Sequence, residues 1–134
     1  MIPTHLADAS AWAQLHRNDV AARLVPLLVG GGAATCGIVD LQIIATFDDA
    51  AVRAEVAAER ATFPRVPVDD AVLDRAAEVL ALLPGADVEA LSVVVAAAAE
   101  RAGLVLLHQD AAYDRIAEVT GQPTEWVVAR GTVP

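Results

Sequence analysis

Short apolar segments alternate with longer amphipathic ones along this chain, and this alternation constrains the fold more than any other feature. Candidate buried strands are THLA before Asp8, AATC at 33–36, RVPV at 65–68, LVLLH at 104–108 and WVV at 126–128. Helical patterns separate them, at about 9–17, 18–29, 37–47, 49–61, 71–83, 87–102 and 111–119. Strands of this kind, joined by helices, imply a parallel sheet covered on both faces. The sequence therefore predicts an α/β fold with three layers and a short central parallel sheet.

Local signals support the predicted helix ends. Three glycines at 30–32 suit a helix C-terminus followed by a tight turn. Asp69 and Asp70 can cap the helix that follows them, and Gly103 and Gly121 can close the last two long helices.

Length and composition indicate one folded domain that spans residues 1–134. The chain is 56% hydrophobic but only 4% aromatic, which is unlike a disordered segment. Its net charge of −9 argues against a broadly basic surface that holds nucleic acid by neutralising phosphates. A nuclease remains compatible with this charge, because bound metal ions can supply positive charge locally.

The single cysteine, Cys36, excludes an internal disulfide framework. The longest apolar tract, LSVVVAAAA at 91–99, is about half the length of a membrane-spanning helix and is interpreted as a buried helix. The first residues do not show the charged segment followed by an apolar one that is typical of a signal peptide. We therefore expect a cytoplasmic protein.

Two predicted strands end in acidic residues: Asp8 follows the first, and Asp110 follows LVLLHQ. In an open α/β sheet, ligands bind beyond the carboxyl ends of the strands. Carboxylates gathered there can hold Mg²⁺ or Mn²⁺, which activates water and neutralises charge on a phosphodiester. That chemistry typically needs three or four carboxylates. The alternative is that Asp8 and Asp110 each cap the helix that follows, and spacing alone favours the capping role.

Other catalytic motifs are absent from the sequence. GGGAAT lacks the lysine of a phosphate-binding loop, and neither G-x-S-x-G nor H-E-x-x-H occurs. His5, His16 and His108 are scattered, so each is expected to be a structural or surface residue. Cys36 is expected to be a small core residue.

Several stretches together resemble one family, the PIN-domain proteins of the VapC toxin type. They are THLADASAWAQL, AATCGIVDLQII and LSVVVAAAAERAGLVLLHQDAAYDRIAEVTGQPTEWV, and the resemblance covers nearly the whole chain. It implies a PIN-like fold and Mg²⁺-dependent ribonuclease activity on RNA. It also implies a homodimer, inhibited by an antitoxin whose C-terminal segment wraps the toxin near its acidic pocket.

The functional residues of the family transfer only in part. Its first Asp corresponds to Asp8, and the Asp after its last core strand corresponds to Asp110. The family's Glu falls on Gln42, counted from Cys36, and the Asp that opens its alanine-rich helix falls on Ser92, counted back from Gly103. Two of the four principal carboxylates are therefore replaced by neutral side chains.

A further acid of the family is Ala112 here, whereas Asp114 is retained. The loss of two charges should lower cation affinity and relieve repulsion between the remaining acids. Asp40 precedes Gln42 by two positions, which turns it about 200° away on a helix. Glu89 lies three positions before Ser92 and could reach the same face, but it sits near the start of the helix. The two positions could also be misplaced by one helical turn.

Three functions follow from these observations. The favoured one is a PIN domain with a degenerate site and little or no catalysis, retained to bind an antitoxin-like partner or another protein. The second is an active endoribonuclease with Asp8 and Asp110 as metal ligands, assisted by Asp114. The third is an α/β ligand-binding module whose acids are helix caps. The early helices, with Trp12, Leu15, Leu24, Leu27 and Leu28, are interpreted as core rather than as a partner groove or dimer contact.

Overall fold

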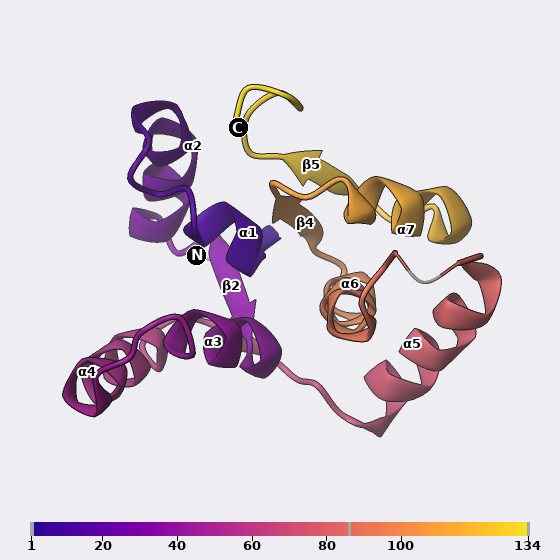
Figure 1. Cartoon of the computed structure of the whole chain (residues 1–134), viewed down its shortest axis with the longest axis horizontal. Coiled ribbons are helices and arrows are strands. Elements are labelled where there is room, and N and C mark those ends of the chain that lie inside the picture. Colours follow the sequence, from indigo (N-terminus) through magenta and orange to yellow (C-terminus); the bar gives the residue numbers. More distant parts are fainter. Residues whose placement is uncertain (1, 86, 134) are drawn as a thin grey trace.

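The computed structural model describes residues 2–85 and 87–133 and has a five-stranded parallel sheet at its centre (Figure 1). The strand order is β3-β2-β1-β4-β5, and every neighbouring pair is parallel. The strands are β1 (His5–Ala7), β2 (Ala33–Cys36), β3 (Arg65–Val66), β4 (Val105–His108) and β5 (Thr124–Trp126). The predicted parallel α/β sheet is therefore confirmed.

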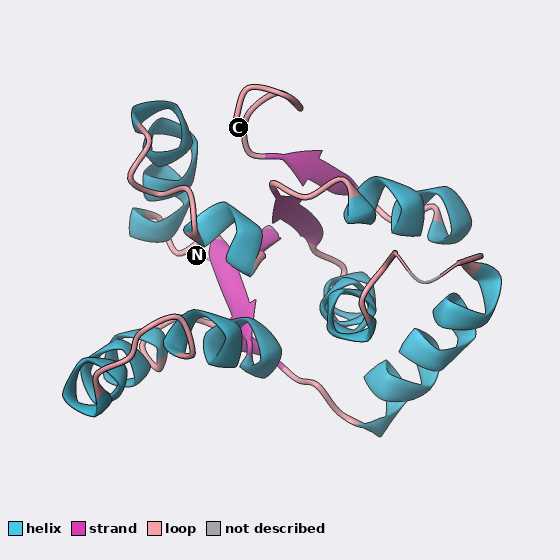
Figure 2. Ribbon diagram, in the orientation of Figure 1, coloured by secondary structure: helices cyan, strands magenta, loops and turns pink. Residues whose placement is uncertain are grey.

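Helices connect consecutive strands, as Figure 2 shows. They are α1 (Ala9–Trp12), α2 (Asn18–Val29), α3 (Gly37–Ile44), α4 (Ala50–Arg60), α5 (Asp70–Leu82), α6 (Ala90–Ala102) and α7 (Ala112–Thr120). The predicted bounds of α2 are confirmed at both ends. Asp69 caps α5 by accepting a hydrogen bond from the backbone N–H of Val72, 3.0 Å away.

Successive residues of β1 and β4 point to opposite faces of the sheet, which creates a core on each side. Leu6 and Leu106 belong to the larger core with α5, α6 and α7, whereas Ala7 and Leu107 belong to the smaller core with α1 and α2. Figure 1 shows α5, α6 and α7 on one side of the view, with α2 on the other. The sheet is therefore the middle layer of three, as predicted.

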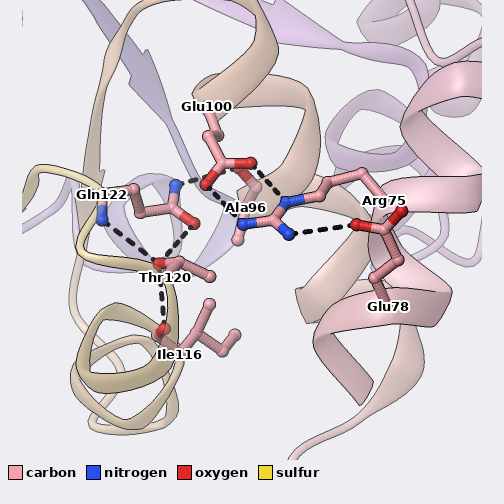
Figure 3. A network of polar contacts seen from close by, with 7 residues as sticks. All are labelled: Arg75, Glu78, Ala96, Glu100, Ile116, Thr120 and Gln122. Atoms are coloured by element: carbon pink, nitrogen blue, oxygen red, sulfur yellow. Dashed lines mark hydrogen bonds and ion pairs between the residues drawn. The ribbon is translucent and has the colours of Figure 1, made fainter. Parts of the chain in front are cut away.

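The alanine-rich helix α6 is buried along its middle, from Val93 to Ala99. Small side chains let neighbouring elements approach it closely. Gln122 is buried next to it and donates from Nε2 to the carbonyl oxygen of Ala96, 2.9 Å away (Figure 3). On the other side, Arg75 of α5 forms an ion pair with Glu100 at 2.7 Å. Polar contacts therefore tie α6 to α5 and to the segment after α7.

Several predicted bounds shift in the structure, including those of α3, which ends at Ile44 rather than 47, and β3, which ends at Val66 rather than 68. Helix α1 ends at Trp12, and residues 13–17 form turns with hydrogen bonds between residues three apart, such as Leu15 N–H to the Trp12 carbonyl at 3.1 Å. Helix α6 begins at Ala90 rather than near 87. Strand β5 ends at Trp126, because its pairing with β4 is in register from Thr124 to Trp126.

Candidate functional site

Asp8 and Asp110 follow two neighbouring strands of the sheet. Asp8 comes directly after β1 and Asp110 comes two residues after β4. The strands pair in parallel, with Ala7 opposite Leu107, and the backbone N–H of Asp8 donates to the carbonyl oxygen of Leu107 at 2.9 Å. Both acids therefore lie at the carboxyl edge of the sheet, where α/β folds bind ligands.

The Asp8 carboxylate is 5% exposed and receives three hydrogen bonds. Its Oδ2 accepts from the backbone N–H of Ser10 at 3.0 Å and from the Ser10 hydroxyl at 2.6 Å. Its Oδ1 accepts from the Tyr113 hydroxyl at 2.7 Å. The bond to the Ser10 backbone makes Asp8 the N-cap of α1, so the predicted capping role is confirmed for this residue.

Tyr113 lies on α7 and is 1% exposed. Burial raises the pKa of its phenol far above the usual range, and the negative charge of Asp8 and the hydrogen bond to it add to this shift. The hydroxyl of Ser92, in the first turn of α6, acts in the opposite direction and lowers the pKa of Tyr113. The phenol is therefore protonated at neutral pH and donates to Asp8.

Asp110 is exposed and lies just before α7. Its Oδ1 accepts a hydrogen bond from the backbone N–H of Ala112 at 2.9 Å, so it satisfies a free donor at the start of that helix. Asp110 is not the N-cap itself, however, because the N-cap of α7 is Ala111, which has no side-chain cap hydrogen bond. A carboxylate that accepts one such bond can still ligate a cation, because each oxygen has two lone pairs.

Asp114 is half-buried and directed to the C-terminal segment. Its Oδ1 accepts from the indole N–H of Trp126 at 3.1 Å, and its Oδ2 lies 3.4 Å from a guanidinium nitrogen of Arg130. Ala112, at the other position where the family carries an acid, is half-buried and has no polar side-chain atom.

His108 is fully buried at the end of β4, between the rings of Tyr113 and Trp126, whose centroids lie 5.0 and 4.9 Å away. Its Nδ1 accepts from the backbone N–H of Asp110 at 3.1 Å, so a neutral ring carries its proton on Nε2. Burial lowers the pKa of His108, and the charges of Asp114, Asp8 and Asp110 oppose this shift. A neutral, structural His108 agrees with the sequence prediction.

Gln42 of α3 lines a cleft of about 540 Å³ between α1 and α3. The cleft also contains Ser10, Trp12, Ile43 and Phe47, so one wall begins beside Asp8. Within the described residues, the Oε1 of Gln42 is buried and accepts no hydrogen bond. Trp12 packs partly against both cores, which supports its interpretation as a core residue.

Asp40 lies 3% exposed in a separate cluster. Its Oδ1 accepts from Nε of Arg60 at 2.9 Å, and its Oδ2 accepts from Arg65 at 2.8 Å. The Arg60 guanidinium also stacks on the Trp12 ring, 4.4 Å from its centroid. Glu89 is exposed at the start of α6.

Sequence reasoning assigned no role to Tyr113. Its position three residues after Asp110 was visible in the sequence, but contact with Asp8 depends on how α7 packs across the sheet edge. In residues 2–85 and 87–133, no three His, Cys, Asp or Glu side chains gather closely enough to hold a metal ion. Over the same residues, no helix is long and apolar enough to cross a membrane.

Curated proteins similar to this chain are ribonucleases of one type. Ribonuclease VapC18 of Mycobacterium tuberculosis is 37% identical over 132 residues, which cover 94% of this chain and 96% of that protein. Ribonuclease VapC21 of the same species is 36% identical over 141 residues, covering 98% and 99%. No family model matches the chain.

Solved structures with the same fold include toxin–antitoxin complexes. The DNA-bound VapBC structure from Salmonella typhimurium superposes with a TM-score of 0.73 at 15% identity, over 94% of this chain and 99% of that one. A toxin–antitoxin complex from Klebsiella pneumoniae gives a TM-score of 0.72 at 12% identity, over 93% and 98%. At such identities the structural likeness shows the fold alone.

Proposed function

Because the chain belongs to the VapC family of PIN-domain ribonucleases, we propose that it is a single-domain toxin-type protein with lost or weakened nuclease activity. In this proposal residues 1–134 form one PIN-like domain. The domain is retained to bind an antitoxin-like protein, and it works as a homodimer in the cytoplasm.

This proposal rests on the side chains that are available as metal ligands at the carboxyl edge of the sheet. Mg²⁺ and Mn²⁺ prefer carboxylate oxygens and usually keep several waters. The four principal positions hold Asp8, Gln42, Ser92 and Asp110, so only two of them can contribute charge. These side chains do not match the three or four carboxylates that the chemistry needs.

Neighbouring acids are poorly placed to restore the missing charge. Asp40 is already paired with Arg60 and Arg65. Glu89 is exposed, and Asp114 accepts hydrogen bonds from Trp126. Among the retained acids, Asp8 and Asp110 remain the candidate metal ligands, with Asp114 in an assisting role.

An antitoxin partner is supported by the structures that share this fold, which include VapBC complexes. The cleft beside Asp8 offers an apolar wall that includes Trp12, Ile43 and Phe47. A basic antitoxin side chain would meet fewer carboxylates here than in a complete acidic pocket. We therefore expect weaker charge pairing at this point of the interface.

The alternative is an active Mg²⁺- or Mn²⁺-dependent endoribonuclease that a cognate antitoxin neutralises. The observation in its favour is that Asp8 and Asp110 follow adjacent strands, so both carboxylates stand at one edge. In this case the Gln42 amide oxygen would have to serve as a neutral ligand, and RNA would be the substrate.

One experiment separates the two functions. Mn²⁺ is titrated into the natural chain and into the double variant Gln42→Glu, Ser92→Asp, and both are assayed on structured RNA. We expect metal binding and cleavage only in the double variant. As a matched control, Asn18→Asp with Thr62→Glu adds two acids at exposed positions outside the cleft and should restore nothing.

Cleavage by the natural chain at the rate of the double variant would overturn the proposal in favour of the active enzyme. Absence of metal binding by both proteins would show that Gln42 and Ser92 are not the positions of the missing ligands. Sedimentation of the natural chain tests the homodimer, which should have twice the 13.9 kDa mass of one chain.

A further inference from the structure

We propose that Tyr113 is a positioning residue that holds the buried Asp8 carboxylate by a hydrogen bond from its phenol, a neutral donor. This inference rests on the proposed function, because it explains how a site short of carboxylates keeps its remaining buried acid satisfied. Asp8 then serves as a hydrogen-bonded junction between β1, α1 and α7.

The geometry accounts for both oxygens of Asp8. Oδ2 accepts two bonds from Ser10, at 3.0 and 2.6 Å, and Oδ1 accepts one from the Tyr113 hydroxyl at 2.7 Å. A buried ion without partners is costly, and hydrogen bonds to a charged group are stronger than neutral ones. Asp8 is therefore satisfied by the chain itself.

The hydrogen bonds of Asp8 continue through Ser10 to the loop that contains Asp110. The Ser10 hydroxyl donates its one proton to Asp8 and accepts from the backbone N–H of Gln109, 2.9 Å away. Gln109 and Tyr113 flank Asp110 in sequence, and both are tied back to the segment Asp8–Ser10. The end of β4 and the start of α7 are thus fastened to the end of β1 at two points.

This arrangement has a consequence for metal binding. A cation that approaches Asp8 at Oδ1 must compete with the buried Tyr113 phenol, which has no other carboxylate partner among the described residues. The removal of the phenol oxygen alone should therefore free one lone pair of Asp8 and make the acid a better ligand.

A double-mutant cycle in EDTA measures the contact without any metal. The variants are Asp8→Asn, Tyr113→Phe and their combination, each unfolded in urea. We expect each single variant to lower the folding equilibrium constant about tenfold or more, as for other hydrogen bonds to charged groups. The double variant should be little worse than Asp8→Asn alone.

Thr120→Val is the matched control, because it removes another hydroxyl from α7 whose partners are Ile116 and Gln122. Its effect should add to that of Asp8→Asn. Effects of Tyr113→Phe and Asp8→Asn that simply add would overturn the proposal. If Asp8→Asn does not fold, Ser10→Ala replaces it in the cycle, with the same expectation of coupling through the shared carboxylate.

Two further readouts go beyond stability. Tyr113 is the sole tyrosine of the chain, so the ultraviolet Raman doublet of tyrosine reports its hydroxyl alone and should shift in Asp8→Asn.

In the Gln42→Glu, Ser92→Asp background, Tyr113→Phe should raise Mn²⁺ affinity about tenfold, as measured by electron paramagnetic resonance. An unchanged doublet or an equal affinity would contradict the proposed role.

The outcomes distinguish this inference from the proposed function. RNA cleavage by the natural chain would overturn the degenerate nuclease while leaving the coupling between Asp8 and Tyr113 intact. Additive effects of Asp8→Asn and Tyr113→Phe on stability in EDTA would show that Tyr113 does not hold Asp8. They would not change the interpretation of the nuclease assay.

Discussion

Two buried carboxylates of this protein, Asp8 and Asp40, are satisfied in different ways. Asp40 is surrounded by charge, with Arg60 and Arg65 at 2.9 and 2.8 Å. Asp8 receives only neutral donors, from Ser10 and Tyr113. Both side chains are nearly inaccessible, at 3% and 5% exposure.

The two sets of partners determine which acid can still take a positively charged partner from outside the chain. Asp40 has its counter-charge within the chain, so an added cation would meet two guanidinium groups. Asp8 has no cationic partner among the described residues and lies at the carboxyl edge of the sheet. The Asp40 cluster is therefore structural, whereas in the proposed function Asp8 is the position at which a metal ion or a basic partner residue acts.

The strongest test of the Asp40 cluster removes its buried cation. Arg60→Met leaves Asp40 with the hydroxyl of Thr35 at 2.8 Å and with Arg65, whose side chain is 55% exposed. Loss of one partner from a buried ion pair typically costs about 3–5 kcal/mol, and we expect about 3 kcal/mol because Arg65 persists. Urea unfolding at neutral pH measures the loss.

Arg17→Met is the control, because Arg17 pairs with the exposed Asp19. Its urea midpoint should stay close to that of the natural chain. Equal midpoints for Arg60→Met and Arg17→Met would show that the Asp40 cluster contributes no more than a surface pair.

A second test concerns the pH dependence of stability, to which His108 at the carboxyl edge of the sheet should contribute. The pKa of His108 is lowered by burial from its ordinary value of 6.5, so the unfolded chain binds this proton more readily. Stability is therefore unaffected above pH 6.5 and falls as the pH drops below it, by up to about 1.4 kcal/mol per pH unit for one proton. Urea midpoints between pH 7.5 and 5 should reveal this slope.

His108→Gln keeps an acceptor beside the Asp110 N–H and should flatten the slope over that range. His16→Gln, at an exposed position, should leave the slope as it is. A slope that persists in His108→Gln would assign the pH dependence to other groups.

The smallest expected effect concerns Asp110. Because an Asn side chain can accept the same hydrogen bond from the Ala112 N–H, Asp110→Asn should change metal-free stability by less than about 0.5 kcal/mol, whereas Asp110→Ala should cost about 1 kcal/mol. Made in the Gln42→Glu, Ser92→Asp background, Asp110→Asn should nevertheless abolish Mn²⁺ binding by calorimetry. Retained Mn²⁺ binding would mean that Asp110 serves only to accept the hydrogen bond from the Ala112 N–H.

Much of the fold could be predicted because its local signals agree with one another. The glycines at 30–32, the caps at Asp69 and the closure at Gly103 each mark a helix end that the structure confirms. The sequence predicts a longer α1, because the spacing of Trp12 and Leu15 suits a helix. The same spacing also suits the turns that replace its second half in the structure. Periodicity records which residues are buried, but it does not show whether the backbone stays helical.

The amino-acid sequence is enough to predict the alternation of strands and helices, the family, and the positions at which acids are present or absent. Those properties depend on residue type and on spacing along the chain. The partners of each acid could be found only from the folded structure, because Tyr113 is 105 positions from Asp8 in the sequence and Arg60 is 20 positions from Asp40. Such contacts depend on how α7 packs beside α6 and β5 and how α4 packs beside α3, and local sequence patterns do not show that packing.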